Sequence, residues 1–408
     1  MAMKIKSFSG RHYETGSIHN LLAMQGVKTP HTGKPFSEAF LLGVSGGITF
    51  GYFTFEYKNI LPQLALLTRN TFDPLQTMLE RLGISQQVYQ TTSESAAEKN
   101  LREALAGGNP ALVWADECSL PYSPKKGTAY WNMIPVLVYE LDGDDALIVD
   151  RSAHPFRVPM KELTKARGRV KDDKFRVVTL ASPLTSKLVS AAQKGLWQSI
   201  SLFTDKPPKG ARHNFGFAAY EHFADMLVNK RNKQSWERLF PAGPRMFNAL
   251  AGTAEAPGVF APPGAFTWIQ WFGAGDGAER GLYADFLDEA AILLEKKSLK
   301  DAAGQFRVSR QKWIAFAEAL LPSDIPLFDE VKTLINRKYQ LYFETGEDGL
   351  DEITKVNSRL KKIEEVMAKK FPLSSEQAAS LRAELRERVL GIAEIEKKAV
   401  ELLQESLK

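Results

Sequence analysis

The chain has 408 residues, of which 44% are hydrophobic and 25% are charged. This composition is typical of a globular protein and excludes disordered and collagen-like chains. The length predicts two or three domains. The formal net charge of +5 is small for this length, so the chain lacks the basic excess typical of nucleic-acid-binding proteins.

Cysteine content and hydropathy indicate the cellular compartment. The single cysteine, Cys118, excludes an intramolecular disulfide and is typical of a reducing compartment. The first ten residues lack the apolar core of a signal peptide, and the apolar stretches are too short to cross a bilayer. We therefore expect a cytoplasmic protein without a membrane partner.

The first 185 residues combine helix and strand patterns. Apolar residues at helical spacing predict helices at 15–25, 37–43, 74–82 and 93–106. Short apolar runs predict strands at 111–115, 134–141, 146–150, 156–158 and 175–180, with a polar turn at 142–145. Residues 61–67 fit either a strand or a short helix. Helices followed by an antiparallel sheet indicate an α+β domain.

Beyond residue 186 the strand signals nearly vanish. Helical spacing recurs at 188–204, 215–229, 281–297, 309–320 and 327–343. Two charged helices at 349–370 and 374–407 are expected to form an αα-hairpin, and Ser374 with Gln377 fits a capping box. We divide the chain into an α+β domain (1–185), a helical domain (186–322) and a C-terminal helical hairpin (323–408). The amphipathic hairpin also leaves self-association open.

One long loop interrupts the helical part. Residues 254–277 contain three prolines and five aromatic side chains. A loop of this length often lies over a functional site, although a loop that packs its own aromatic side chains fits equally well.

Standard catalytic and cofactor motifs are absent from the sequence. It has no Walker loop, no dinucleotide-binding glycine motif, no H-E-x-x-H and no C-x-x-C. None of the six histidines is four residues from another. We therefore expect neither a cofactor nor a metal site.

The first fifty residues hold the most informative cluster. In GRHYETG, His12, Tyr13 and Glu14 come directly before the helix 15–25, where free N–H groups and the helix dipole favour a nucleophile or an oxyanion. In GVSGGITFGYF, Gly46 and Gly47 permit close backbone approach and are candidate pocket residues. A purely structural alternative is that Glu14 or Thr15 caps the helix and the glycines pack tightly.

The segment GRHYETGSIHNLLAMQG, followed by SEAFLLGVSGGITFGYF, resembles the start of the butirosin biosynthesis protein H family. Residues 277–291 (GAERGLYADFLDEAA) are similar to the helical domain that often follows it, so the resemblance spans about 8–320. The resemblance implies a papain-like N-terminal domain. It also implies acyl transfer, in which a thiol takes an acyl group from a carrier-protein thioester and passes it to an amine. The implied partners are an acyl carrier protein or acyl thioester and a small amine.

Two of the family's expected catalytic groups are missing. The family's cysteine falls at Tyr13, whose phenol is almost wholly neutral at pH 7 with an ordinary pKa of about 10. The family's histidine should precede the strand IPVLVYELD, at Ile134 or Pro135, but neither these positions nor Asn132 nearby carries an imidazole. His12, Glu14 and the acid at Asp150 do match. The usual Cys/His mechanism therefore cannot operate.

Three hypotheses remain. The scaffold binds a ligand or partner, or transfers an acyl group by proximity alone, with His12 or Glu14 as base and Tyr13 as hydrogen-bond donor. Alternatively, Tyr13 acts as an acid/base or a metal ligand beside His12 and Glu14. Finally, Cys118 in ADECSLPY supplies the thiol, although most free cysteines are inert.

Other candidate groups lie farther along the chain. His154 is close enough to Asp150 to replace the missing histidine, but a surface loop histidine is the simpler interpretation. Asp116 and Glu117 suit an amine substrate, but a solvated strand end is simpler. Glu279 and Tyr283, one helical turn apart, are expected to border the pocket.

The sequence as a whole favours an acyltransferase-like protein of specialised metabolism that lacks the cysteine nucleophile. If the chain is an enzyme, it works without the Cys/His pair. The alternatives are a non-catalytic scaffold that binds a ligand or carrier protein, and a divergent enzyme that uses Tyr13, His12 and Glu14.

Overall fold

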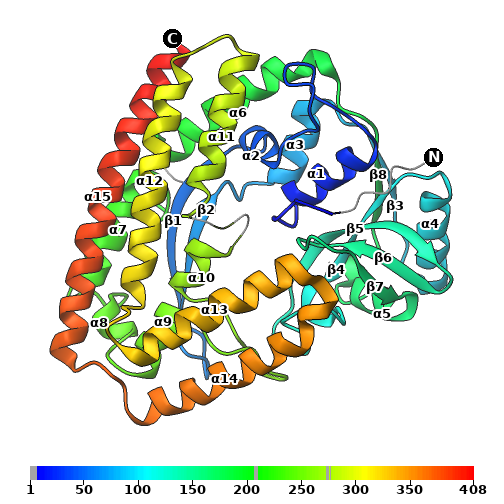
Figure 1. Ribbon diagram of the computed structural model, residues 1–408. Coiled ribbons are helices and arrows are strands. Elements are labelled where there is room, and N and C mark those ends of the chain that lie inside the picture. Colours follow the sequence, from blue (N-terminus) through cyan, green and yellow to red (C-terminus); the bar gives the residue numbers. More distant parts are fainter. Residues whose placement is uncertain (1–6, 206–209, 273–274, 276) are drawn as a thin grey trace.

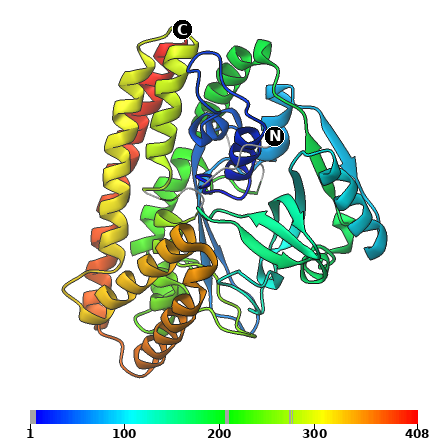
Figure 2. The ribbon, with the colours of Figure 1, turned by 45° about the vertical axis from the view of Figure 1, so that its right-hand side comes forward.

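A computed structural model describes residues 7–205, 210–272, 275 and 277–408. It confirms the α+β class, with the main sheet in the N-terminal part and helices in the C-terminal part. Figures 1 and 2 show the long helices on one flank and the six-stranded sheet on the opposite flank. Among the described residues, no helix combines the length and the hydropathy needed to cross a membrane.

The larger sheet is antiparallel throughout, with the order β3-β8-β4-β5-β6-β7. The predicted strands and the polar turn at Gly143 are confirmed, and β3 is an additional edge strand. The strands are β3 (Gln86–Tyr89), β4 (Ala111–Asp116), β5 (Met133–Asp142), β6 (Asp145–Val149), β7 (Phe156–Pro159) and β8 (Val177–Leu180).

Two early strands form a separate hairpin within the helical half of the molecule. Strand β1 (Ile48–Phe55) pairs antiparallel with β2 (Gln63–Arg69), which settles the ambiguity at 61–67 in favour of a strand. Figure 1 shows β1 and β2 among the C-terminal helices, and both strands contact those helices rather than the larger sheet.

The N-terminal helices begin and end where local signals predicted. Ser37 Oγ accepts the N–H of Phe40 at 2.9 Å, and Ser93 Oγ accepts that of Ala96 at 3.4 Å. Gly83 ends α3 at a φ of 65°, a conformation that favours glycine. The helices are α1 (Thr15–Met24), α2 (Glu38–Val44), α3 (Pro74–Leu82), α4 (Glu94–Ala106) and α5 (Met160–Arg167), of which α5 was not predicted.

The C-terminal part is helical, as predicted. Its helices are α6 (Leu188–Thr204), α7 (Gly216–Val228), α8 (Trp236–Leu239), α9 (Pro244–Ala251), α10 (Ala265–Gln270), α11 (Arg280–Leu293), α12 (Leu299–Leu320), α13 (Pro326–Thr345), α14 (Leu350–Lys369) and α15 (Ser375–Leu407). The predicted aromatic loop contains α10, and residues 273, 274 and 276 of that loop lie outside the described residues.

The last two helices do not form the expected hairpin. The helix α15 runs along α12 and α7, whereas α14 packs against α13 (Figure 1). The predicted capping box is confirmed, since Ser374 Oγ accepts the N–H of Gln377 while the Gln377 side chain accepts that of Ser374. The pairing differs because α15 buries a charged residue, Glu396, against its neighbours.

Glu396 anchors α15 through a fully buried ion pair with Arg280. Arg280 Nε donates to Glu396 Oε1 at 2.8 Å, and both side chains have no exposed surface. The same carboxylate accepts hydrogen bonds from Tyr220, Ser309 and Trp313. These partners come from α7 and α12, so the ion pair joins α15 to the centre of the helical half.

Two apolar clusters organise the interior. The larger cluster joins residues of α1, α2 and β1 with helices as far as α15. The smaller fills the space between the six-stranded sheet, α5 and the end of α13. Both clusters therefore contain residues from each side of residue 185.

Candidate functional site

The start of α1 is held by a carboxylate from α2. Glu38 accepts the backbone N–H of Arg11 at 2.7 Å and that of His12 at 2.9 Å, together with the hydroxyl of Thr15 at 2.9 Å. Glu14 occupies the cap position of α1, but its side chain makes no capping hydrogen bond there. Glu38 thus performs the role that the purely structural alternative gave to Glu14 or Thr15.

His12 is buried and electrically neutral. Its Nδ1 accepts the backbone N–H of Glu14 at 3.2 Å, which places the imidazole proton on Nε2. Burial, followed by the positive charges of Arg69 and Arg151, lowers the His12 pKa well below its usual value. The Nδ1 lone pair is engaged and Nε2 carries the proton, so His12 has no free lone pair with which to accept a proton.

Tyr13 is partly buried, and its ring lies against the ring of His12 with centroids 4.0 Å apart. Burial and the negative charge of Glu14 raise the pKa of the Tyr13 phenol to about 12, although Arg69 and Arg151 oppose this shift. At pH 7 only about one molecule in 10⁵ carries a phenolate at this position. Tyr13 is therefore a hydrogen-bond donor and a very weak nucleophile.

Glu14 differs from its neighbours because it titrates near neutral pH. Burial and the negative charge of Asp73 raise its pKa to about 7, and Arg69 opposes this shift. A carboxylate with this pKa suits a general base. Among the described residues, however, Glu14 is not one of those that line the cavity described below.

Asp150 follows β6, and both of its carboxylate oxygens accept hydrogen bonds. Its Oδ1 accepts from Arg151 Nε at 2.7 Å, and its Oδ2 accepts from the hydroxyls of Tyr122 and Tyr342, each at 3.1 Å. Tyr342 belongs to α13, so a C-terminal helix closes over the acid. Asp150 thus connects the sheet to α13 and is held by an arginine and two phenols.

Glu117 is the second buried acid of the site. Its carboxylate accepts from Lys125 Nζ at 3.0 Å, Arg151 Nη2 at 2.9 Å and Asn132 Nδ2 at 3.2 Å. These two cations lower its pKa against the opposing effect of burial.

The interpretation of Asp116 and Glu117 as a solvated strand end is wrong, because both side chains are buried. Asp116 accepts the N–H groups of Cys118 and Asn132, and it thereby fixes the turn after β4.

A cavity of about 690 Å³ opens beside this ion network. Tyr13, Glu117 and Asn132, which the sequence analysis named, line it together with Arg151, which it did not. Of the 29 described residues that line it, twelve are aromatic, and they include Phe260, Trp268, Trp271 and Phe272 of the predicted aromatic loop. The loop therefore forms part of the cavity wall, which agrees with the interpretation that it lies over a functional site.

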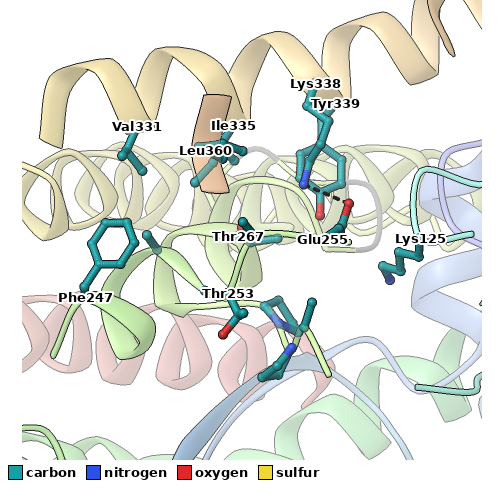
Figure 3. Close-up of a pocket in the computed structure, with 16 residues that line it drawn as sticks. Lys125, Phe247, Thr253, Glu255, Thr267, Val331, Ile335, Lys338, Tyr339 and Leu360 are labelled. Atoms are coloured by element: carbon teal, nitrogen blue, oxygen red, sulfur yellow. Dashed lines mark ion pairs between the residues drawn. The ribbon is translucent and has the colours of Figure 1, made fainter. Parts of the chain in front are cut away.

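A small adjoining hollow of about 40 Å³ lies behind α13. Figure 3 shows Lys338 on this helix paired with Glu255, and Lys125 on the neighbouring wall. Lys338 Nζ lies 3.2 Å from Glu255 Oε2 and 5.0 Å from the centre of the Tyr339 ring. All four residues also line the larger cavity, so α13 contributes both charge and aromatic surface to it.

Four predicted pocket residues lie elsewhere, in the buried centre of the molecule. A Cβ atom at Gly47 would be 2.8 Å from Tyr283 Cε2, and one at Gly46 would be 2.5 Å from Asn70 Nδ2. Glu279 makes a buried ion pair with Arg69. Among the described residues, Gly46, Gly47, Glu279 and Tyr283 are not part of the cavity wall, and the close packing of the glycines matches the structural alternative.

Cys118 and His154 do not supply the missing groups. Burial and the charges of Glu117 and Asp116 raise the Cys118 pKa to about 11, so the thiol is neutral at pH 7. His154 is exposed on a loop, as the simpler interpretation had it. Neither residue is among the described residues that line the cavity.

Sequence reasoning missed four partners of the acids: Tyr122, Lys125, Arg151 and Tyr342. Tyr122 stands within the quoted motif ADECSLPY, Lys125 follows that motif after two residues, and Arg151 directly follows Asp150. Tyr342 lies 192 residues from Asp150 and carries no local signal. In the described part of the chain, no three His, Cys, Asp or Glu side chains gather as metal ligands.

Residues 12–151 match the model of the family described as butirosin biosynthesis protein H, N-terminal. This part of the chain belongs to that family. The match includes Tyr13, Asn132 and Asp150 and ends at Arg151, so the family region contains both acids of the network. The family match does not include α13. No curated protein matches the chain significantly.

Proposed function

We propose that this member of the butirosin biosynthesis protein H family is a binding protein related to biosynthetic acyl transfer. It holds an acyl-type ligand non-covalently in the aromatic cavity and forms no covalent acyl-enzyme. The observation that carries the proposal is the combination, in one cavity, of an aromatic wall with a phenol at the nucleophile position. A volume of about 690 Å³ lies within the usual range of small-molecule sites, about 300–1,000 Å³.

The absence of a proton relay supports binding over covalent catalysis. A nucleophile needs a base within hydrogen-bond reach, and that base needs a residue that orients it. His12 has no free lone pair, and Asp150 is committed to Arg151 and two tyrosines. Glu117 is held as an anion by Lys125 and Arg151. Asp150, Glu117, Arg151 and Lys125 are thus paired with one another.

The papain-like fold expected from the resemblance remains part of this proposal. Helix α1, which follows Tyr13, contacts β5 of the antiparallel sheet, and Asp150 follows the adjacent strand β6. A helix start that faces neighbouring antiparallel strands is the arrangement that the resemblance implies. An acyl carrier protein and a small amine remain the proposed partners.

A second candidate is templated transfer, in which an amine attacks a bound thioester directly. The pKa of about 7 at Glu14 favours it, because half of these carboxylates are ionised at neutral pH. Its weakness is the position of Glu14 outside the cavity wall.

The test uses the hydrocinnamoyl thioester of N-acetylcysteamine, a neutral thioester with an aromatic body. Binding is followed by tryptophan fluorescence and covalent change by the intact mass of the chain. We expect saturable binding with no mass increase, in the wild type and in Tyr13→Phe alike. An acyl adduct mapped to Tyr13 or Cys118 would contradict the proposal. Amide formation with an added amine, lost in Glu14→Gln, would replace it with templated transfer.

A further inference from the structure

Five exposed apolar side chains line the cavity. Phe55, Tyr57 and Ile60 come from the β1–β2 hairpin, and Tyr130 and Trp131 come from the segment before β5. Each of the five is exposed, from 38% at Phe55 to 55% at Tyr57. Exposed aromatic surface gathered at one opening is typical of a ligand-binding site.

Pairs of aromatic rings lie on both walls of the mouth. Along β1 the rings of Phe55 and Tyr57 stack nearly parallel, with an interplanar angle of 8° and centroids 6.3 Å apart. Tyr130 meets Phe260 edge to face at 5.4 Å. Such rings offer their faces to a planar or extended apolar body.

The inner end of the cavity carries a surplus of hydrogen-bond donors. An arginine has five N–H groups and a lysine ammonium has three. Arg151 uses Nε and Nη2 on Asp150 and Glu117, and among the described residues its Nη1 has no acceptor. Within the described part of the chain, the Lys125 ammonium makes one hydrogen bond, to Glu117, and the Lys338 ammonium pairs with Glu255.

The donors at the inner end are cationic groups that neighbouring carboxylates partly engage. Among the described residues, Lys125, Arg151 and Lys338 line the cavity with Glu117 and Glu255, and Arg151 also pairs with Asp150. Nearby carboxylates raise the pKa of both lysines, so they stay protonated at neutral pH. Lys125 is the most accessible of the three, with a side chain that is 28% exposed.

We propose that the cavity takes a ligand with a carboxylate at one end and an aromatic or apolar body at the other. The carboxylate accepts hydrogen bonds from Lys125 and Arg151, and the body lies against the aromatic side chains of the mouth. This inference rests on the proposed function, because it names the ligand class of the same cavity. An amine-terminated ligand should bind more weakly at this end, because it would bring further donors to side chains whose free groups are donors already.

The test compares three ligands that share one body: hydrocinnamate, hydrocinnamamide and phenylpropylamine. Their affinities are measured by isothermal titration calorimetry at pH 7 and low salt. We expect hydrocinnamate to bind about tenfold more tightly than the amide, and the amine to bind more weakly than both. A carboxylate that binds no more tightly than the amide would overturn the inference, while binding of the amide and of the thioester would keep the proposed function. Failure of every compound, thioester included, would overturn both.

Matched variants locate the interaction. Lys125→Gln should lower the affinity for hydrocinnamate about tenfold and leave that for the amide unchanged. Lys126→Gln is the control, since Lys126 is the next residue, is exposed and does not line the cavity. Equal weakening of acid and amide in Lys125→Gln would contradict the assignment. If Lys125→Gln fails to fold, the comparison of the three ligands with the wild-type protein decides the inference.

The aromatic mouth is tested separately. Trp131→Ala should weaken acid and amide alike, because both place the same body against this wall. Trp197→Ala is its control, since Trp197 is exposed to a similar extent, 49%, on α6 and lies outside the cavity. Unchanged affinities in Trp131→Ala would contradict the proposed position of the body.

Discussion

The contacts of Asp150 are those of a structural anchor, and Asp150→Asn tests this role against the catalytic role that the resemblance implies. The side chain is 1% exposed and receives four hydrogen bonds, two from Arg151 and one each from Tyr122 and Tyr342. An asparagine keeps the shape but turns one acceptor into a donor that faces donors. It also leaves Arg151 with Glu117 as its remaining anionic partner.

The size of the effect follows from these contacts. Hydrogen bonds to a charged group contribute about 1.5–3 kcal/mol each, and breaking a buried ion pair costs about 3–5 kcal/mol. Because Glu117 still neutralises Arg151, we expect Asp150→Asn to lower the free energy of unfolding by about 3 kcal/mol. The assay is urea unfolding at pH 7, followed by tryptophan fluorescence and circular dichroism.

Asp144→Asn serves as the control, since its side chain is fully exposed at the β5–β6 turn. It should change the free energy of unfolding by less than about 0.5 kcal/mol. If Asp150→Asn unfolds at the same urea concentration as the wild type, the anchoring role is refuted and Asp150 is free for chemistry.

Two further predictions concern pH and the buried ion pair of α15. The Glu14 pKa is raised to about 7 in the folded state, so the folded chain binds more protons than the unfolded chain between about pH 4.5 and 7, and stability falls as pH rises through this window. Glu14→Gln should therefore be about 1–2 kcal/mol more stable than the wild type at pH 8 and equal to it in stability at pH 4. If the variant and the wild type are equally stable at both pH values, the raised pKa of Glu14 is contradicted. Glu396→Gln should cost about 3–5 kcal/mol in urea unfolding because it leaves Arg280 charged and buried, whereas the exposed control Glu401→Gln on the same helix should cost almost nothing. A loss below about 1 kcal/mol in Glu396→Gln would refute the role of this ion pair.

Local signals explain what the sequence predicted well. Helices with a serine cap or a glycine stop, such as those after Ser37 and Ser93 and before Gly83, were placed within a residue or two. Their signals lie inside the segment itself, so no distant partner is needed. The edge strand β3 and the charged helix α5 were missed because QQVY and MKELTKAR carry too few apolar residues for a clear period.

Long-range partners explain what the sequence did not predict. In the sequence, Glu117 resembles a solvated residue, but in the fold it is paired with Lys125 and Arg151. Glu396 resembles part of a charged helix face, but in the fold it is paired with Arg280. Gly47 and Tyr283 were placed in one pocket and are indeed neighbours, but their contact is closed packing. Residue type and spacing suggested that these groups meet, and only the fold decides whether space remains between them.

Helix α13 has a consequence for how this chain compares with its family. It supplies Lys338, Tyr339 and Tyr342 to the cavity and to Asp150, yet it begins far beyond residue 151, where the family match ends. The described residues that line the cavity therefore come from the family-matched region and from two later segments, the loop at 255–272 and α13. Chains that share the motif around position 13 need not share a ligand, and substitutions in α13 offer a route to new selectivity that leaves the N-terminal motif intact.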